Sequence, residues 1–136
     1  ISEEAFWDNF NKHQNFLKEV TGKDCTIFRF PGGSHNTLVR NAHGSSFTEN
    51  IILKLNEQGI NCYDWNVDSG DAKGNNIPAA TIYNNVVKES RDKNGELKSP
   101  AIVLMHDCMT KTTTVEALPK IIQYFKEQGY KFDTLN

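Results

Sequence analysis

Three short polar clusters, far apart in the sequence, contain residue types that often do chemistry. Arg29 opens residues 29–33 (Arg-Phe-Pro-Gly-Gly), aspartates recur within residues 64–71, and His106 lies within residues 104–107 (Leu-Met-His-Asp). Histidine titrates near neutral pH, so a histidine beside carboxylates is suited to proton transfer. Each cluster follows an apolar, strand-like segment, and α/β sheets and barrels build their active sites at that end of the strands. We therefore expect the three clusters to converge on one site.

The elements that must position these clusters alternate between helix and strand. Apolar spacing predicts helices over residues 3–21, 46–58, 78–92 and 113–128, and strands over residues 25–30, 60–67, 101–105 and 130–135. Thr113 and Glu116 have the spacing of a capping box, and Pro119 is expected to displace or bend the start of the last helix. Such alternation predicts parallel strands joined by helical crossovers, in an open sheet or part of a barrel.

Composition and charge exclude several functional classes. The chain has 136 residues, with 15 Lys and Arg against 17 Asp and Glu. It has no basic stripe of the kind that would indicate nucleic-acid binding. The longest apolar run, residues 101–105, is far shorter than the ~20 residues of a membrane-spanning helix. We expect no signal peptide and no membrane segment in this sequence. The cysteines and histidines show no metal-ligand spacing.

The three clusters resemble the last three of the five motifs of the NodB-homology polysaccharide deacetylases, carbohydrate esterase family four. Residues 28–34 look like the third motif, residues 68–71 (Asp-Ser-Gly-Asp) like the fourth, and residues 104–106 (Leu-Met-His) like the fifth. Residues 114–120, after the fifth motif, are also typical of the family. The likeness is strongest to peptidoglycan N-acetylglucosamine deacetylases of clostridium-like Gram-positive bacteria. It implies an α/β fold that is part of a distorted (β/α) barrel of NodB type.

Two departures from the family pattern affect what the chain is expected to do. Ala72 stands where the fourth motif usually ends in Trp, so one groove wall is expected to be built differently. The family's Thr-Phe-Asp-Asp-Gly and His-x-x-x-His motifs, which supply a catalytic base and metal ligands, do not occur. Residues 1–136 would then be the C-terminal portion of the domain, inactive and without catalytic metal alone. Its expected partner is the missing N-terminal piece or a swapped copy of itself.

The resemblance also implies a reaction and a role for individual residues. The reaction would be hydrolysis, assisted by zinc or cobalt in the complete domain, of the N-acetyl group of N-acetylglucosamine in peptidoglycan or a related glycan. His106 would be the general acid, Asp68 would orient and charge its imidazole, and Arg29 would hold the missing catalytic aspartate. Leu104 would floor the acetyl pocket. The other residues expected at the substrate are Pro31, Gly32, Tyr63 and Trp65. An extracellular or cell-wall location follows from such a substrate.

Each assignment has a structural alternative. His106 could be a hydrogen-bonded structural residue, Arg29 a surface ion-pair partner, and Asp64 and Asp71 turn-shaping residues. Two other functions stay open: a carbohydrate-binding or structural remnant that keeps the fold without the chemistry, and an unrelated α/β module. In such a module, residues 32–34 (Gly-Gly-Ser) would cradle a phosphate, although the Walker-type lysine is lacking.

Overall fold

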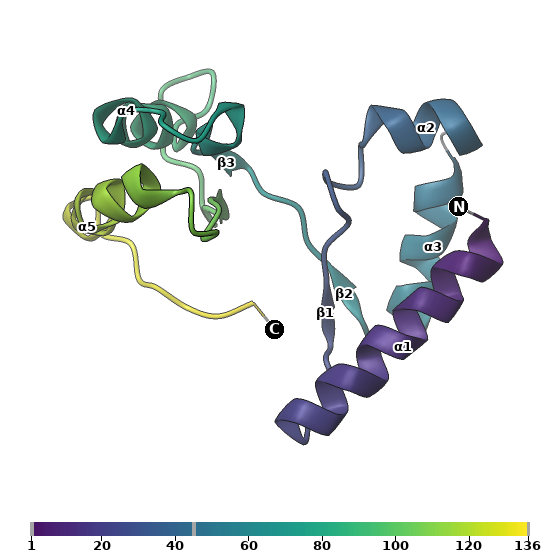
Figure 1. Ribbon diagram of the computed structural model, residues 1–136. Coiled ribbons are helices and arrows are strands. Elements are labelled where there is room, and N and C mark those ends of the chain that lie inside the picture. Colours follow the sequence, from purple (N-terminus) through teal and green to yellow (C-terminus); the bar gives the residue numbers. More distant parts are fainter. Residues whose placement is uncertain (1, 45, 136) are drawn as a thin grey trace. The chain divides into compact units, whose positions relative to one another are not determined.

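The computed structural model describes residues 2–44 and 46–135, which form two compact units. The N-terminal unit comprises residues up to Asp64 together with Thr134 and Leu135, and the C-terminal unit comprises residues 65–133. Each unit contains helices and a pair of very short parallel strands (Figure 1). No helix in the described parts of the chain is long and apolar enough to cross a membrane.

The N-terminal unit places its parallel strand pair among helices. β1 and β2 pair with Ile27 opposite Asn61 and Phe28 opposite Cys62. In Figure 1 the two strands run beside α1 and α3. In chain order, its described elements are α1 (Glu3–Thr21), β1 (Ile27–Phe28), α2 (Thr37–His43), α3 (Ser46–Glu57) and β2 (Asn61–Cys62).

Helix α1 begins and ends where its sequence predicts. The Ser2 hydroxyl accepts a hydrogen bond from the Ala5 amide at 3.2 Å, which satisfies one of the free donors of the first turn. Glu3 and Glu4 place negative charge at the positive end of the helix. Gly22, with φ of 72°, then adopts the left-handed conformation that ends many helices.

Aromatic rings dominate the core of the N-terminal unit. The rings of Phe28 and Phe30, on one side of β1, meet edge to face with centroids 4.9 Å apart. Phe6 from α1 packs against both of them. The buried members of this core are Phe10, Ile51, Leu55 and Ile60. Burial of such rings is a large source of hydrophobic stabilisation, so this core fixes the start of the turn that follows β1.

The C-terminal unit carries the second strand pair and the two best-packed helices. β3 and β4 pair in parallel, with Val67 opposite Val103 and Asp68 opposite Leu104. The described elements are β3 (Val67–Asp68), the 3₁₀ turn η1 (Asp71–Lys73), α4 (Ala79–Glu89), β4 (Val103–Leu104) and α5 (Thr112–Glu127).

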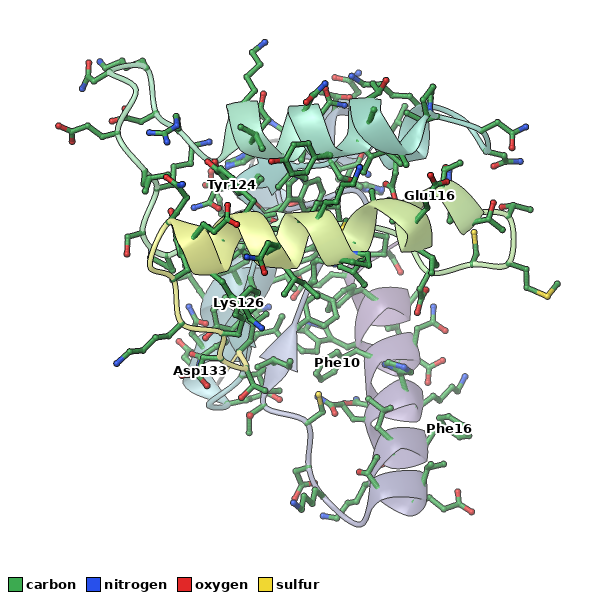
Figure 2. The ribbon with its side chains drawn as sticks, turned by 90° about the vertical axis from the view of Figure 1, so that its left-hand side faces the viewer. Phe10, Phe16, Glu116, Tyr124, Lys126 and Asp133 are labelled. Atoms are coloured by element: carbon green, nitrogen blue, oxygen red, sulfur yellow. The ribbon has the colours of Figure 1, made fainter. Side chains whose placement is uncertain are left out.

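Helices α4 and α5 pack on each other over the core of the C-terminal unit. In Figure 2 Tyr124 lies between these two helices, where its hydroxyl is 2.9 Å from the Ser90 hydroxyl. Phe16, labelled in the same figure, is instead exposed on α1. The buried residues of this core are Val67, Ile82, Val86, Ala117, Ile121, Tyr124 and Phe125.

The sequence predicted these helices closely and the strands less well. Residues 60–67, expected to form one strand, form parts of two: β2 pairs with β1, while β3 pairs with β4. Asn66 bonds the residues before β4 through its backbone as well as its side chain, since its amide donates to the Ile102 carbonyl at 3.1 Å. The Asn66 side chain accepts from the Ile102 amide and donates to the Pro100 carbonyl, both at 2.8 Å.

The structure differs from the sequence-based expectations at three further places. Helix α2 was not predicted, and its N-cap is Asn36, whose side chain accepts from the Leu38 amide. The expected capping box of Thr113 does not form, because α5 begins one residue earlier with Lys111 as its N-cap. Among the described residues, 130–135 form no strand. Pro119 lies inside α5, which continues through it.

Candidate active site

Asp71, the last residue of the aspartate-rich cluster at residues 64–71, lies in a buried loop that follows β3. Ser69 is fully buried and Asp71 is 1% exposed. Gly70 between them has φ of 71°, in the left-handed region that glycine adopts without strain. The side-chain amide of Asn85, on α4, donates to the Ser69 carbonyl at 3.0 Å. The Ser69 backbone amide donates to the Leu104 carbonyl at 3.3 Å, so the loop is bonded to a helix as well as to the sheet. This rigid support fixes the direction of the Asp71 side chain.

Asp71 and His106 form the central contact of the site. The His106 Nδ1 atom is 2.8 Å from Asp71 Oδ1, and the His106 backbone amide donates to Asp71 Oδ2 at 2.8 Å. Both the ring and the main chain of the histidine are therefore bound to one carboxylate. The His106 side chain is 41% exposed, while that of Asp71 is 1% exposed. A buried carboxylate thus orients an accessible imidazole.

Helix α5 supplies two more contacts to Asp71. The Thr114 hydroxyl donates to Asp71 Oδ2 at 3.0 Å. The Lys111 ammonium group donates to the Asp71 backbone carbonyl and to the Gly74 carbonyl, both at 2.6 Å. Lys111 and Thr114 are both buried. The first turn of α5 therefore holds the Asp71 side chain and main chain at once.

The contacts of Asp71 change its acidity. Burial raises the pKa of this carboxyl, but hydrogen bonds from the His106 ring, the His106 amide and the Thr114 hydroxyl lower it by more. The net result is a pKa of Asp71 below the ordinary value for aspartate. Hydrogen bonds to the charged form favour that form, so Asp71 is ionised at neutral pH.

The role expected of Asp68 belongs to Asp71 in this geometry. Asp68 is exposed, and its Oδ1 accepts from the Gly70 amide at 2.8 Å, so it shapes the turn. Asp71, expected to shape the loop, instead contacts the histidine. The two aspartates are three residues apart in one motif, and only the 3₁₀ turn of η1, which the sequence did not indicate, directs the second inward.

Leu104 lies on the strand face that carries His106. Ala101, Val103 and Met105 pack against the core of the C-terminal unit. Side chains alternate along an extended strand, so Leu104 and His106 share the opposite face. Leu104 is half-buried. Its role as the floor of an acetyl pocket stays a prediction.

The turn after β1 is built around Asp64. The Ser34 amide donates to Asp64 Oδ1 at 3.0 Å, and the Ser34 hydroxyl donates to Oδ2. The Gly33 amide donates to the Phe30 carbonyl at 2.9 Å. The Gly33 and Ser34 amides are therefore already used, and a carboxylate occupies the position that a phosphate would need. The phosphate-binding alternative for residues 32–34 loses its support.

The remaining candidates divide between the two units. Arg29, Pro31 and Gly32 are exposed residues of the N-terminal unit, and Tyr63 in the same unit is half-buried. Trp65 is half-buried in the C-terminal unit. The structure therefore brings His106 and Asp71 together and leaves the roles of these five residues as predictions.

An apolar hollow of about 490 Å³ lies within the N-terminal unit. Phe28 of β1 lines it together with Arg29, Phe30 and Pro31, which follow the strand. Its other aromatic residues are Phe6, Phe10 and Phe47. The cluster at residues 29–33 therefore borders open apolar surface.

Similar proteins identify the family. A solved catalytic domain of a peptidoglycan N-acetylglucosamine deacetylase from Eubacterium rectale is 32% identical, with a TM-score of 0.82, over 99% of this chain and 58% of that chain. A carbohydrate esterase family four enzyme of Streptococcus mutans is 32% identical, with a TM-score of 0.72, over 90% of this chain and 50% of that chain. The chain belongs to the polysaccharide deacetylases of this family. The expected α/β fold of NodB barrel type is confirmed.

The deacetylase relatives are longer than this chain. YheN of Bacillus subtilis, which carries the name polysaccharide deacetylase, is 34% identical over 120 residues, which are 88% of this chain and 37% of YheN. No family model matches the chain. The chain thus spans between a third and three fifths of the length of these relatives.

The metal that the deacetylase family implies does not fit the described residues. A catalytic zinc site takes three protein ligands and leaves a fourth position open. Within residues 2–44 and 46–135, no group of three or more His, Cys, Asp or Glu side chains could hold a metal ion.

Proposed function

We propose that this chain supplies the proton-donating side of a site that removes the acetyl group from N-acetylglucosamine residues of peptidoglycan or a related glycan. The observation that carries the proposal is the 2.8 Å contact between His106 Nδ1 and the buried carboxylate of Asp71. This contact leaves Nε2 as the ring nitrogen that can meet a substrate, on an imidazole that is 41% exposed. The names of the family relatives support the substrate class.

Hydrolysis of an acetamide requires proton transfers at both ends of the reaction. Water adds to the carbonyl carbon and loses a proton to a base. The C–N bond then breaks, and the leaving nitrogen must gain a proton to depart as an amine. Protonated His106 donates that proton from Nε2, while the charge of Asp71 stabilises the imidazolium beforehand. Acetate and the free amino sugar are the products.

The substrate side of the proposal rests on two surfaces. Leu104 shares a strand face with His106, so its side chain forms the floor against which the acetyl methyl packs. Exposed Pro31 and Gly32, with the half-buried rings of Tyr63 and Trp65, contribute to sugar binding. Arg29 holds the carboxylate of the base that accepts the proton from water.

Metal dependence belongs to the proposal for the whole domain. A divalent ion, zinc or cobalt, would polarise the acetamide carbonyl and make bound water acidic. The described residues include no suitable ligand group for this ion. We also propose that another segment of the same domain packs on the aromatic hollow of the N-terminal unit. The substrate polymer favours an extracellular or cell-wall location.

A chimera tests this function directly. The chain replaces the segment that it matches in the Eubacterium rectale catalytic domain, and acetate release from N-acetylglucosamine oligomers is measured. We expect activity, and we expect His106→Asn to lower it by roughly 10²–10⁴-fold, as is usual for loss of a general acid. His43→Asn, on α2 in the N-terminal unit, is the matched control and should retain activity.

The remnant hypothesis makes the opposite forecast. A folded chimera that binds the oligomer but releases no acetate would replace the enzymatic proposal with carbohydrate binding. A chimera whose His106→Asn variant keeps full activity would show that another group protonates the amine.

A further inference from the structure

Lys111 occupies a position that ordinary helix chemistry disfavours. It is the N-cap of α5, and its side chain makes no capping hydrogen bond. Helix N-caps favour Ser, Thr, Asp and Asn, and a cation at this end faces the positive pole of the helix dipole. Lys111 is also only 7% exposed, although burying a charge is costly unless its donors are satisfied. Such a local conflict indicates that the residue serves another purpose.

The contacts of Lys111 show what that purpose is. Its ammonium group donates to the carbonyls of Asp71 and Gly74 at 2.6 Å each. These two carbonyls flank the η1 turn, which has no side-chain cap of its own. One ammonium group therefore fixes both ends of the turn that carries Asp71. Because the Asp71 carbonyl is held, the backbone of Asp71 is held, and with it the direction of the Cα–Cβ bond from which the side chain extends.

The same turn of α5 completes the arrangement. Thr114 lies three residues after Lys111, on the same side of the helix, and donates to Asp71 Oδ2 at 3.0 Å. Asp71 Oδ1 is then left for the His106 ring. Removing the ammonium group would free the turn, so that the carboxylate could rotate or shift away from Nδ1.

We propose that Lys111 is a positioning residue, which clamps the Asp71–Gly74 turn through its two carbonyls and so keeps the Asp71 carboxylate aligned with His106. Lys111 does not touch the substrate in this scheme and acts only through Asp71. The catalytic consequence rests on the proposed function, whereas the alignment itself does not. The same cluster thereby couples the start of α5 to the geometry of the histidine.

The test compares three variants of this protein by NMR. Lys111→Met removes the donors at similar volume, Lys111→Arg keeps a cationic donor, and Lys73→Met removes an exposed lysine of the same turn. We expect a slowly exchanging Nδ1–H resonance of His106 in the parent protein and in Lys73→Met. It should be lost in Lys111→Met and be retained at least in part in Lys111→Arg. If Lys111→Met does not fold, Lys111→Gln replaces it and should weaken the resonance.

Kinetics in the chimera provide the second readout. We expect kcat to fall between about tenfold and 10²-fold in Lys111→Met, the cost of a misplacement near 1 Å, with KM unchanged. A folded Lys111→Met or Lys111→Gln variant that keeps the resonance would overturn the proposal. If the parent chimera is inactive, the proposed function fails, but the NMR comparison still decides whether Lys111 aligns Asp71.

Discussion

At the scale of single residues, the candidate site depends on how many hydrogen bonds the Asp71 carboxylate accepts. Asp71 takes a ring contact and an amide hydrogen bond from His106 and a hydroxyl hydrogen bond from Thr114. Contacts of a buried carboxylate with several donors fix its orientation and keep it charged. Asp68, in the same motif, bonds only the Gly70 amide among the contacts described above. The two aspartates therefore have different effects on the histidine.

Exchange of each aspartate for asparagine should separate these effects. In the chimera, Asp71→Asn removes the charge that stabilises the protonated imidazole, so we expect a large loss of kcat. Asp68→Asn should have the smaller effect. Equal losses in both variants would return Asp68 to the role first expected for it.

The lowered pKa of Asp71 predicts how stability depends on pH. A carboxyl whose pKa is lower in the folded state stabilises the protein fully above the unfolded-state value, near 4. This contribution is lost as the pH falls toward the folded-state pKa of Asp71. Urea unfolding at pH 6, 5, 4 and 3 should therefore show that the advantage of the parent protein over Asp71→Asn shrinks with acidification. Asp107→Asn, at an exposed residue, controls for net charge, and a constant advantage would contradict the linkage.

At the scale of elements, Gly70 joins β3 to the turn that carries Asp71. A Cβ atom on Gly70 would lie 2.6 Å from Asn85 Nδ2, the donor that holds the Ser69 carbonyl. Gly95 also has positive φ, but a Cβ there would meet no atom within 4 Å. Comparing alanine substitutions at Gly70 and Gly95 therefore separates the cost of backbone strain from the cost of the clash with Asn85.

We expect Gly70→Ala to destabilise the protein more than Gly95→Ala. The left-handed conformation costs an alanine about 1–2 kcal/mol at either position. Gly70→Ala should additionally disturb the Asn85 hydrogen bond, worth about 0.5–1.5 kcal/mol. Urea or thermal unfolding of both variants measures the difference, and the His106 Nδ1–H resonance should change only in Gly70→Ala. Equal destabilisation would mean that Asn85 moves aside without cost.

The elements also show which parts of the fold the sequence could predict. Helix α1 followed from Ser2, its apolar stripe and Gly22, since caps and periodicity are local signals. The division of residues 60–67 between two strand pairs was not predictable, because it depends on Asn66 meeting residues 100 and 102. Similarly, the His106 position followed from its motif, whereas the contacts of Lys111 and Thr114 with Asp71 depend on where α5 begins. The available signal in the sequence was Lys111, a cation placed directly before residues 112–114 (Thr-Thr-Thr) at the start of a predicted helix.

At the scale of the whole molecule, the contacts of the candidate site lie within one of the two units. His106, the proposed proton donor, and Asp71 both lie in the C-terminal unit, and the described residues hold no group of three metal-ligand side chains. His106 has one ring nitrogen bound to Asp71, so it could offer a metal only Nε2. A single nitrogen falls short of the three ligands that a catalytic zinc site requires.

We therefore expect no tight one-to-one binding when this chain is titrated with Zn²⁺ or Co²⁺ in a calorimeter. The chimera, which adds residues of the Eubacterium rectale domain, should bind the metal and require it for acetate release. His106→Asn in the chimera should abolish most of the activity while leaving metal affinity nearly unchanged, because we propose that the histidine donates a proton and is not a ligand. Tight binding by the chain alone, lost in His106→Asn, would instead make His106 a metal ligand. Its hydrogen bond to Asp71 would then serve to orient that ligand, as the partners of metal-bound histidines do.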